Sequence, residues 1–400
     1  MRLSNSVLIV SSIVAMVKAS PYYGSVYGEP KLPSVSFPCG DDIPNWVANI
    51  GIGTPRQTMP LLLDTSSSAT WVAGVQCPSN FCTTRQCSLF DAGKSSTITN
   101  YYVEETFRYE EGSVDTTLYS DNLYVDNFEF EDFEFGKAFE VHGFNKYSTY
   151  AGILGLGDDS EFEFVKRADE PEGRKSRKKS NHGENSKIAE RASLRGGSDR
   201  VAKNERGVSD ERQCRFTIGL DESIQGDIAW LDFPTCDYGP SPYWKAKLKC
   251  VEIGDLITLG FDKTVALFDT SVQNIQVPHK DIAIIHQGLA AQYNQQSNQY
   301  EFPCCNAKEL KFSFEKYDVT LPVKAWTRQV GEDTCTDIFE VREPSQFEDN
   351  NTWRLGTKFM INFVTILDRE ERRTGLALIA DNANDGLKIK ANMQTPSDAY

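Results

Sequence analysis

The sequence predicts an all-β protein whose chain folds as two related lobes. Its 400 residues are about twice the usual length of one domain. Its 28 glycines and 17 prolines interrupt the apolar residues along the chain, which favours short strands and many turns over long helices. Two segments, residues 61–67 and 265–271, share one form: an apolar strand that ends in Asp-Thr-Ser. This repetition, about half a chain apart, indicates two lobes that carry equivalent loops.

The first residues are typical of a signal peptide for export. Arg2 precedes an apolar run at residues 7–17, and Val17 and Ala19 occupy the small-residue positions before a cleavage site. The alternative, a membrane anchor, would need a longer apolar run, which Lys18 interrupts. The C-terminal residues are polar and carry no signal for a lipid anchor. We therefore expect cleavage after Ala19 and secretion without a membrane anchor, with a vacuolar or lysosome-like compartment as the alternative destination.

Charge and cysteine content limit the partners and cofactors. The formal net charge of −15 argues against a nucleic-acid partner, because an acidic surface repels phosphates. Ten cysteines, an even number in an exported chain, predict disulfides. Cys77, Cys82 and Cys87 are close enough to be either loop staples or metal ligands, but the four histidines show no ligand spacing with them. We therefore expect structural disulfides and no metal.

Composition divides the chain into successive parts. Short apolar runs separated by turn residues predict strands over most of it, and residues 128–135 alternate Phe with acidic residues, the period of a half-buried strand. Residues 158–212 contain almost no aromatic side chains and a basic cluster at 174–179, so they cannot bury enough apolar surface to fold. We interpret them as a disordered insert that acts as a solvated spacer, with a processing site or a polyanion contact as the alternative.

The expected order is a signal peptide at 1–19, an N-terminal lobe at 20–157, the insert at 158–212, the end of that lobe and the inter-lobe connection at 213–235, a C-terminal lobe at 236–385 and a polar tail at 386–400.

Asp64 and Asp269 end the two repeated strands and are the candidate catalytic residues. A carboxylate placed directly after a buried strand is costly unless it is hydrogen-bonded or paired. Two carboxylates held close together cannot easily both ionise, so they share a proton. One of them can then act as a base toward water while the other donates a proton to a peptide carbonyl. The pair is therefore compatible with hydrolysis without a metal or a cofactor. On this chemistry alone the alternative, two ordinary turns, is favoured, because Asp and Ser are common turn residues.

The residues around both aspartates resemble those of the pepsin-like aspartic proteases of the A1 type. Residues 52–55, 63–68 and 71–72 are similar, without gaps, to the N-terminal catalytic loop of that family, residues 107–113 to its flap hairpin, and residues 153–156 to the segment threaded beneath the first catalytic loop. In the second lobe, residues 243–248, 269–271, 335–336, 355–356 and 363–377 repeat the order of the family. The resemblance covers nearly everything except the leader, the insert and the tail. It implies a bilobal fold of two β-barrel-like lobes with a cleft between them.

The resemblance also implies roles for single residues of the two loops. Asp64 and Asp269 correspond to the catalytic aspartates. Thr65 and Thr270 match the threonines that lock the two loops together across the pseudo-twofold axis. Ser67 matches a hydroxyl that hydrogen-bonds the first aspartate.

In the flap hairpin, Tyr109 takes the place of the family tyrosine that closes over the substrate and bonds toward Trp71. A purely structural tyrosine is the alternative. The resemblance further implies a disulfide between Cys77 and Cys82, and another between Cys335 and either Cys304 or Cys305. It leaves undecided the partners of five cysteines: Cys39, Cys87, Cys214, Cys236 and Cys250.

Six positions near the aspartates depart from the family pattern. Ser66 and Ser271 stand where the family has glycine. Each serine adds a Cβ and a hydroxyl that could crowd the attacking water, or change the pKa values of the pair by donating to a carboxylate. Val272 and Gln273 stand where the family has a threonine or serine hydroxyl beside Asp269. Arg354 replaces an apolar residue, and Thr357 replaces an aspartate.

The sequence therefore supports two hypotheses. The first is a secreted aspartic-type endopeptidase that acts as a monomer on protein or peptide substrates at acidic pH. The second is a catalytically impaired protein of the same fold that binds peptides or a protein partner. The persistence of both aspartates, both threonines, Trp71 and Tyr109 favours the enzyme, whereas Ser66, Ser271 and Val272 favour the binder.

Overall fold

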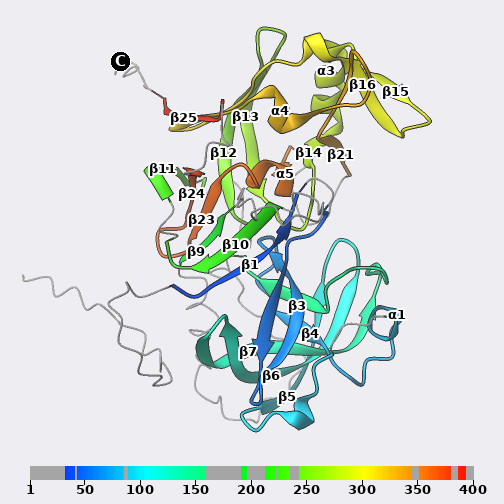
Figure 1. The fold of residues 1–400 in the computed structure, drawn as a ribbon, viewed down its shortest axis with the longest axis vertical. Coiled ribbons are helices and arrows are strands. Elements are labelled where there is room, and N and C mark those ends of the chain that lie inside the picture. Colours follow the sequence, from blue (N-terminus) through cyan, green and yellow to red (C-terminus); the bar gives the residue numbers. More distant parts are fainter. Residues whose placement is uncertain are drawn as a thin grey trace, which may run out of the picture.

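The computed structural model describes residues 32–40, 43–84, 89–157, 191–195, 212–220, 224–234, 243–343, 351–379 and 386–392. Figure 1 shows two lobes, one above the other, with a further sheet beside their junction. Strands dominate the described residues. The α-helices among these residues are α3 (His279–Leu289) and the single turns α1 (Asn80–Thr83), α4 (Val323–Trp326) and α5 (Thr357–Met360). The predicted all-β class with two lobes is confirmed.

The first lobe is built on a seven-stranded sheet. Its strands lie in the order β2 (Val47–Ile52), β3 (Gln57–Asp64), β8 (Gly152–Gly155), β4 (Trp71–Ala73), β7 (Phe128–His142), β6 (Ser113–Val125) and β5 (Thr99–Arg108), with an additional pairing of β2 and β6. The predicted alternation of Phe with acidic residues falls in β7, where Phe133 and Phe135 are buried and Glu134 between them is partly exposed. One face of this strand therefore packs into the core, as its period-2 pattern indicates.

The second lobe contains an eight-stranded sheet and a four-stranded sheet. The larger runs in the order β21 (Phe339–Arg342), β14 (Ile275–Pro278), β22 (Trp353–Leu355), β13 (Ile257–Phe268), β12 (Lys245–Ile253), β17 (Leu310–Phe314), β18 (Tyr317–Leu321) and β25 (Lys388–Ala391). The smaller runs in the order β15 (Gln292–Asn294), β16 (Gln299–Pro303), β20 (Thr334–Asp337) and β19 (Thr327–Gln329). Because β25 belongs to the larger sheet, residues 388–391 are not part of a free polar tail.

A six-stranded sheet is assembled from distant parts of the chain. Its order is β1 (Ser34–Cys39), β10 (Arg212–Ile218), β9 (Arg191–Arg195), β23 (Val364–Asp368), β24 (Arg373–Ile379) and β11 (Ile224–Asp232). In Figure 1 this sheet lies beside the junction of the lobes, with the blue β1 next to the green β10. The sheet therefore joins β1, the strands β9 to β11, and the pair β23 and β24, which are far apart in the chain.

Strand β9 corrects the prediction of a disordered insert at 158–212. Its five residues pair with β10 on one side and with β23 on the other. The backbone groups of a central strand are hydrogen-bonded to both neighbours, which stabilises a segment whose composition alone argues against folding. Arg212 likewise belongs to β10. The basic cluster at 174–179 and the signal peptide at 1–19 lie outside the described residues.

Both lobes have well-filled aromatic cores. The largest fully buried side chains include Trp46, Trp71, Trp244, Trp326 and Trp353. Each buried aromatic side chain removes roughly 150–250 Å² of surface from water, so these residues contribute strongly to stability. The indole N–H of Trp244 donates to the carbonyl of Leu156 at 2.7 Å, which links the second lobe to the strand beneath the first catalytic loop.

Three disulfides are formed among the described cysteines. The predicted Cys77–Cys82 disulfide is confirmed. Cys335 pairs with Cys304 and not with Cys305, which is exposed. A third disulfide, Cys39–Cys214, joins β1 to β10. Cys250 has no disulfide partner among the described residues, while Cys87 and Cys236 lie outside them.

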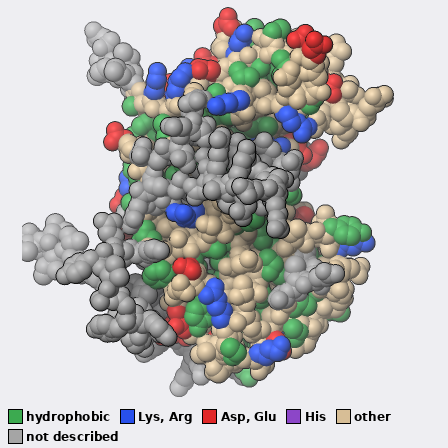
Figure 2. Space-filling model, in the orientation of Figure 1, with side chains coloured by type: hydrophobic (Ala, Val, Ile, Leu, Met, Phe, Trp, Pro, Cys, Tyr) green, Lys and Arg blue, Asp and Glu red, His purple; other side chains and the backbone are tan. Residues whose placement is uncertain are grey.

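Charged side chains of both signs lie on the described part of one face of the molecule (Figure 2). On the face drawn in Figure 2, acidic and basic side chains are interspersed, and the outline narrows between the two lobes. None of the helices in the described ranges has the length and hydrophobicity needed to cross a membrane.

Candidate active site

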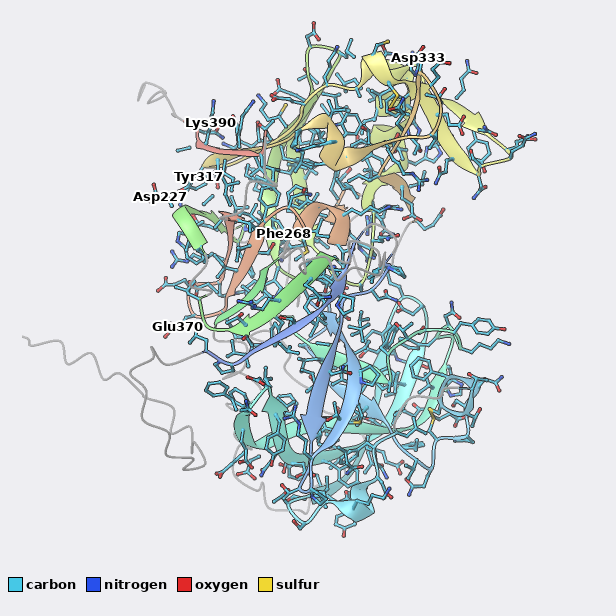
Figure 3. All side chains as sticks on the ribbon, viewed as in Figure 1. Asp227, Phe268, Tyr317, Asp333, Glu370 and Lys390 are labelled. Atoms are coloured by element: carbon cyan, nitrogen blue, oxygen red, sulfur yellow. A yellow bond between two sulfur atoms is a disulfide. The ribbon has the colours of Figure 1, made fainter. Side chains whose placement is uncertain are left out.

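Each candidate catalytic aspartate lies at the end of a central strand of its lobe. Asp64 is the last residue of β3, and Asp269 directly follows β13. The strand beside each one is parallel: β8 beside β3, and β22 beside β13. Phe268, the residue before Asp269, is labelled near the middle of the molecule in Figure 3, at the level where the two lobes meet. Both aspartates are buried, with 2% and 1% of their surface exposed.

Thr65 and Thr270 connect the two loops by reciprocal hydrogen bonds. The backbone N–H of each threonine donates to the hydroxyl oxygen of the other at 3.0 Å. Each hydroxyl in turn donates to a carbonyl of the opposite loop, that of Phe268 for Thr65 and that of Leu63 for Thr270. All these groups are buried, so their hydrogen bonds replace the ones they would make to water. The two loops are therefore held in one fixed relationship, with the arrangement that the resemblance implies.

A glycine beneath each loop permits close packing. A Cβ on Gly155 would lie 2.6 Å from the backbone carbon of Ser68, and a Cβ on Gly356 would lie 2.3 Å from the carbonyl oxygen of Asn274. Real side chains do not approach a backbone so closely. The glycines therefore allow the strand beneath each loop to support it directly.

Ser66 and Ser271 hydrogen-bond the aspartates in the same way in both lobes. Oδ1 of Asp64 accepts the backbone N–H of Ser66 at 2.8 Å and its hydroxyl at 2.6 Å. Oδ1 of Asp269 accepts the same two groups of Ser271 at 2.9 and 2.6 Å. The implied bond from Ser67 to Asp64 is not formed in this structure: the hydroxyl of Ser67 donates to the carbonyl of Ala69 at 3.5 Å and accepts the backbone N–H of the same residue at 3.2 Å. The added hydroxyl of Ser66 is closer to the carboxylate and takes that role.

The two serine hydroxyls also contact each other. Their oxygens are 3.4 Å apart, so they form a path of oxygens that runs from Asp64 through Ser66 and Ser271 to Asp269. A hydroxyl donates only once. If Asp64 carries the proton, Asp64 donates to Ser66, Ser66 to Ser271, and Ser271 to an ionised Asp269, so that every oxygen of the path is used. The arrangement therefore lets one proton be shared between the two carboxyl groups through the serines.

Burial and charge set the protonation of Asp64. Its pKa is raised to about 7. Burial is the largest cause, and the negative charge of Asp269 is the second. The hydrogen bonds from Ser66 act in the opposite direction, because they stabilise the ionised carboxylate. Asp64 is thus the member of the pair that holds a proton at acidic pH.

Asp269 faces a buried arginine with its second oxygen. Its Oδ2 makes no hydrogen bond within the described residues, but it lies 3.7 Å from Nε of Arg354. The Arg354 side chain is only 6% exposed. Val272, noted in the sequence for its missing hydroxyl, contributes backbone contacts here: its carbonyl accepts the N–H of Thr357 at 2.9 Å. Arg354 therefore forms an ion pair with Oδ2 of Asp269, the oxygen that accepts no hydrogen bond from a hydroxyl.

The flap hairpin is formed by β5, β6 and the turn between them. The backbone N–H of Tyr109 donates to the carbonyl of Gly112 at 2.8 Å, which closes the turn. The ring of Tyr109 packs edge-on against Phe144, which packs in the same way against Trp71. The Tyr109 hydroxyl and the Trp71 indole nitrogen are both buried, and neither has a well-aligned hydrogen-bond partner within the described residues. The two groups still interact: burial raises the pKa of Tyr109, and side-chain hydrogen bonding with Ser67 and Trp71 partly offsets that increase. The bond between Tyr109 and Trp71 therefore stays a prediction, while both residues belong to one aromatic cluster.

Two acidic residues at the tip of the flap were missed by sequence reasoning. Glu110 forms a two-pronged salt bridge with Arg354, at 2.8 and 2.6 Å. Burial raises the pKa of Glu111, and the charges of Asp269 and Glu110 raise it further, while its own backbone N–H and Arg354 lower it. The replacement of an apolar residue by Arg354 was the only signal in the sequence for a charge at this place, because a buried arginine requires an acidic partner.

One cluster outside the dyad could hold a cation. Asp115, Glu140 and His142 place one ligand atom each within 4.8 Å of one another. The three residues lie on β6 and β7, and Glu140 and His142 are exposed. Exposed acidic groups often cluster without an ion, so we assign this group no role.

Comparison with known proteins agrees with this geometry. A family model described as eukaryotic aspartyl protease matches residues 45–171 and 207–379, and the chain therefore belongs to that family. Bovine pregnancy-associated glycoprotein 2 (Bos taurus) is 25% identical over 357 residues, covering 83% of this chain and 81% of the relative. Embryonic pepsinogen from Gallus gallus is 26% identical over 351 residues, and chymosin from Ovis aries is 25% identical over 349; each covers 83% of this chain and 80% of the relative.

Proposed function

We propose that this protein is a secreted endopeptidase that hydrolyses peptide bonds in proteins at acidic pH, with a water molecule activated between Asp64 and Asp269. One observation carries the proposal. Both aspartates are buried at equivalent strand ends and are coupled electrostatically, while the reciprocal bonds of Thr65 and Thr270 hold their loops together. A fixed pair of carboxyl groups with one proton is what water activation requires.

The protonation of the pair suggests a role for each carboxyl group. Asp269, ion-paired with Arg354, acts as the base that takes a proton from water as its oxygen attacks the peptide carbonyl carbon. Asp64, protonated below about pH 7, donates its proton to the carbonyl oxygen. The resulting tetrahedral diol loses the amine when the nitrogen takes a proton from Asp269 and Asp64 recovers one from a hydroxyl. The dyad then has its starting protonation.

A second candidate function is peptide binding without turnover. It is favoured by Ser66 and Ser271, whose hydroxyls already occupy Oδ1 of both aspartates at 2.6 Å. If these bonds persist when substrate is present, fewer acceptor sites remain to orient a water molecule. The fold would then retain its binding surface and lose its chemistry.

Digestion of a denatured protein by the purified mature protein tests the choice between the two. If the protein is an endopeptidase, we expect cleavage across pH 3 to 7 and inhibition by a statine-type transition-state mimic. We also expect at least about a thousandfold loss of kcat in Asp64→Asn, because that variant cannot donate the proton. Glu309→Gln, which removes an exposed charge paired with Lys388, is the control. Cleavage that persists in Asp64→Asn contradicts the mechanism. Binding of the mimic without turnover by the unmodified protein selects the second function.

Export and assembly state are separate parts of the proposal. Secretion of a monomer predicts that the protein accumulates in the culture medium of a eukaryotic expression host, begins at Ser20, and elutes with the mass of one chain. Retention inside the cell with Met1 present would contradict it.

A further inference from the structure

The side chain of Arg354 is buried within the second lobe. The residue lies on β22, where its backbone pairs with Leu267 of β13 and with Gln276 of β14. The strand is central in its sheet, and 6% of the arginine side chain is exposed. Nε of Arg354 faces Asp269 at 3.7 Å. The guanidinium is therefore held in place from two sides beside the proposed catalytic centre.

The other edge of the guanidinium is occupied by a carboxylate from the flap. Glu110 accepts from both terminal nitrogens of Arg354, a geometry in which the planar fork of arginine matches a carboxylate. The two residues are 244 positions apart in the chain. Glu110 belongs to the turn of a hairpin and is 37% exposed, in contrast to 6% for Arg354. The arginine is thus the fixed member of the pair, and the glutamate is the member that can leave.

A peptide that enters beneath the flap must meet this pair, because the pair bridges the flap turn and the strand next to Asp269. Lifting Glu110 away would break two charge-assisted hydrogen bonds of a buried guanidinium, which is unfavourable. A peptide with a carboxylate at this position restores both hydrogen bonds, whereas a neutral peptide does not.

We propose that Arg354 is a carboxylate-binding subsite beside Asp269, that Glu110 occupies it in the free protein, and that an acidic group of a bound peptide replaces Glu110. The carboxylate of Glu110 stands in for the carboxylate of the ligand. The inference names the substrate class of the proposed function and rests on it for the binding of peptides. Two sources supply the same chemistry: an Asp or Glu side chain within the peptide, or its C-terminal carboxylate.

The two residues have separable effects on binding. Loss of Glu110 removes the cost of displacing the flap carboxylate, so all peptides bind more tightly by the same factor. Loss of Arg354 removes the bonds that distinguish an acidic peptide from a neutral one, so the preference disappears. These two patterns differ from those of a merely structural salt bridge, whose loss would weaken all peptides alike.

The test measures the affinity of fluorescent statine-containing peptides, which need no turnover, at pH 5.5. A series carries Glu or its neutral isostere Gln at each position in turn, and each peptide is made with a free or an amidated C-terminus. At one position, or at the C-terminus, the carboxylate peptide should bind roughly tenfold to a hundredfold more tightly, as expected for a charge-assisted two-pronged bond. The position that responds identifies the source of the carboxylate.

Variants of Glu110 and Arg354 test whether this salt bridge causes the preference for a carboxylate. Glu110→Ala should tighten both the acidic and the neutral peptide by roughly tenfold and keep their ratio. Arg354→Leu should bring the ratio to about one, and Arg354→Lys, which keeps the charge but not the fork, should leave an intermediate ratio. Glu309→Gln and Arg328→Leu, which alter exposed charges elsewhere, are controls that should match the unmodified protein. Thermal melting identifies any variant that fails to fold, and Arg354→Lys and Glu110→Ala then decide the question.

The outcomes distinguish this inference from the function on which it rests. Peptides that bind with no preference for a carboxylate at any position overturn the subsite and leave the proposed function intact. A preference that persists in folded Arg354→Leu also overturns it. If no peptide of either kind binds, the proposed function fails, and the subsite fails with it.

Discussion

The hydroxyl oxygens of Ser66 and Ser271 lie 3.4 Å apart, and each hydroxyl is 2.6 Å from the aspartate of its own loop. Two of the positions that depart from the family pattern thus meet at the pseudo-twofold axis. Their hydroxyls hydrogen-bond the carboxylates in a symmetric way. Of the two effects expected for these serines, a change in protonation is the one that this geometry supports, and it can be measured.

Replacement of Ser66 by glycine should move the alkaline limit of activity to higher pH. The variant removes the side-chain bond to Oδ1 of Asp64 and keeps the backbone N–H at position 66. Because that side-chain bond opposes the increase in the pKa of Asp64, the carboxyl group should hold its proton to a higher pH. The measurement is kcat/KM as a function of pH or, without turnover, the pH dependence of statine binding. Ser96→Gly, an exposed serine, is the control, and an unchanged limit in Ser66→Gly would refute the assignment of this proton to Asp64.

Asp64 should destabilise the fold as the pH rises from about 4 to about 7. Its pKa is about 7 when folded, against an ordinary value of 3.8. Between these values the folded state binds more protons than the unfolded state, so the free energy of unfolding decreases as the pH rises. The loss grows by about 1.4 kcal/mol per pH unit at most and stops above pH 7. Asp64→Asn removes it.

Chemical denaturation at pH 4, 5.5 and 7 measures this effect. The variant should gain stability relative to the unmodified protein as the pH rises through this range. Asp255→Asn, at an exposed turn, controls for the general effect of removing a negative charge. A difference between Asp64→Asn and the unmodified protein that stays constant with pH would contradict the raised pKa.

Replacement of Thr65 or Thr270 by valine should destabilise the fold by about 1–3 kcal/mol, because a buried N–H of the opposite loop loses its acceptor. The double variant should cost less than the sum of the single ones, since the two residues share one network. Urea denaturation of the four proteins of this cycle gives the coupling energy. Thr106→Val, which removes an exposed hydroxyl bonded to Asp115, is the control. Strictly additive losses would contradict a reciprocal interaction.

The Cys39–Cys214 disulfide should contribute about 2–5 kcal/mol to stability, because it closes a loop of 175 residues in the unfolded chain. Replacing both cysteines by alanine should therefore lower the free energy of unfolding by an amount in this range. Cys305→Ser, at an exposed cysteine without a disulfide, is the matched control. Equal melting temperatures for the double variant and the control would show that this disulfide adds nothing measurable.

Most of the fold was predicted from sequence patterns that each span only a few residues. The apolar strand before each Asp-Thr-Ser, and the glycines at 155 and 356, are recognisable because a strand end and a close backbone contact each need particular residue types over a few positions. Strand β9 was missed for a related reason. Its five residues lie in a polar segment, and the backbone pairing with β10 and β23 that stabilises them comes from distant parts of the chain.

The sequence by itself determined the all-β class, the two lobes, the two aspartates and the threonines beside them, because each depends on a short motif whose geometry is local. The tertiary structure alone decided which atoms meet: that Cys304 and not Cys305 pairs with Cys335, that Ser66 and not Ser67 bonds Asp64, and that Arg354 lies between Asp269 and Glu110. The last of these contacts joins residues 244 positions apart. Such a contact depends on the path of the whole chain, and no pattern within a few residues encodes it.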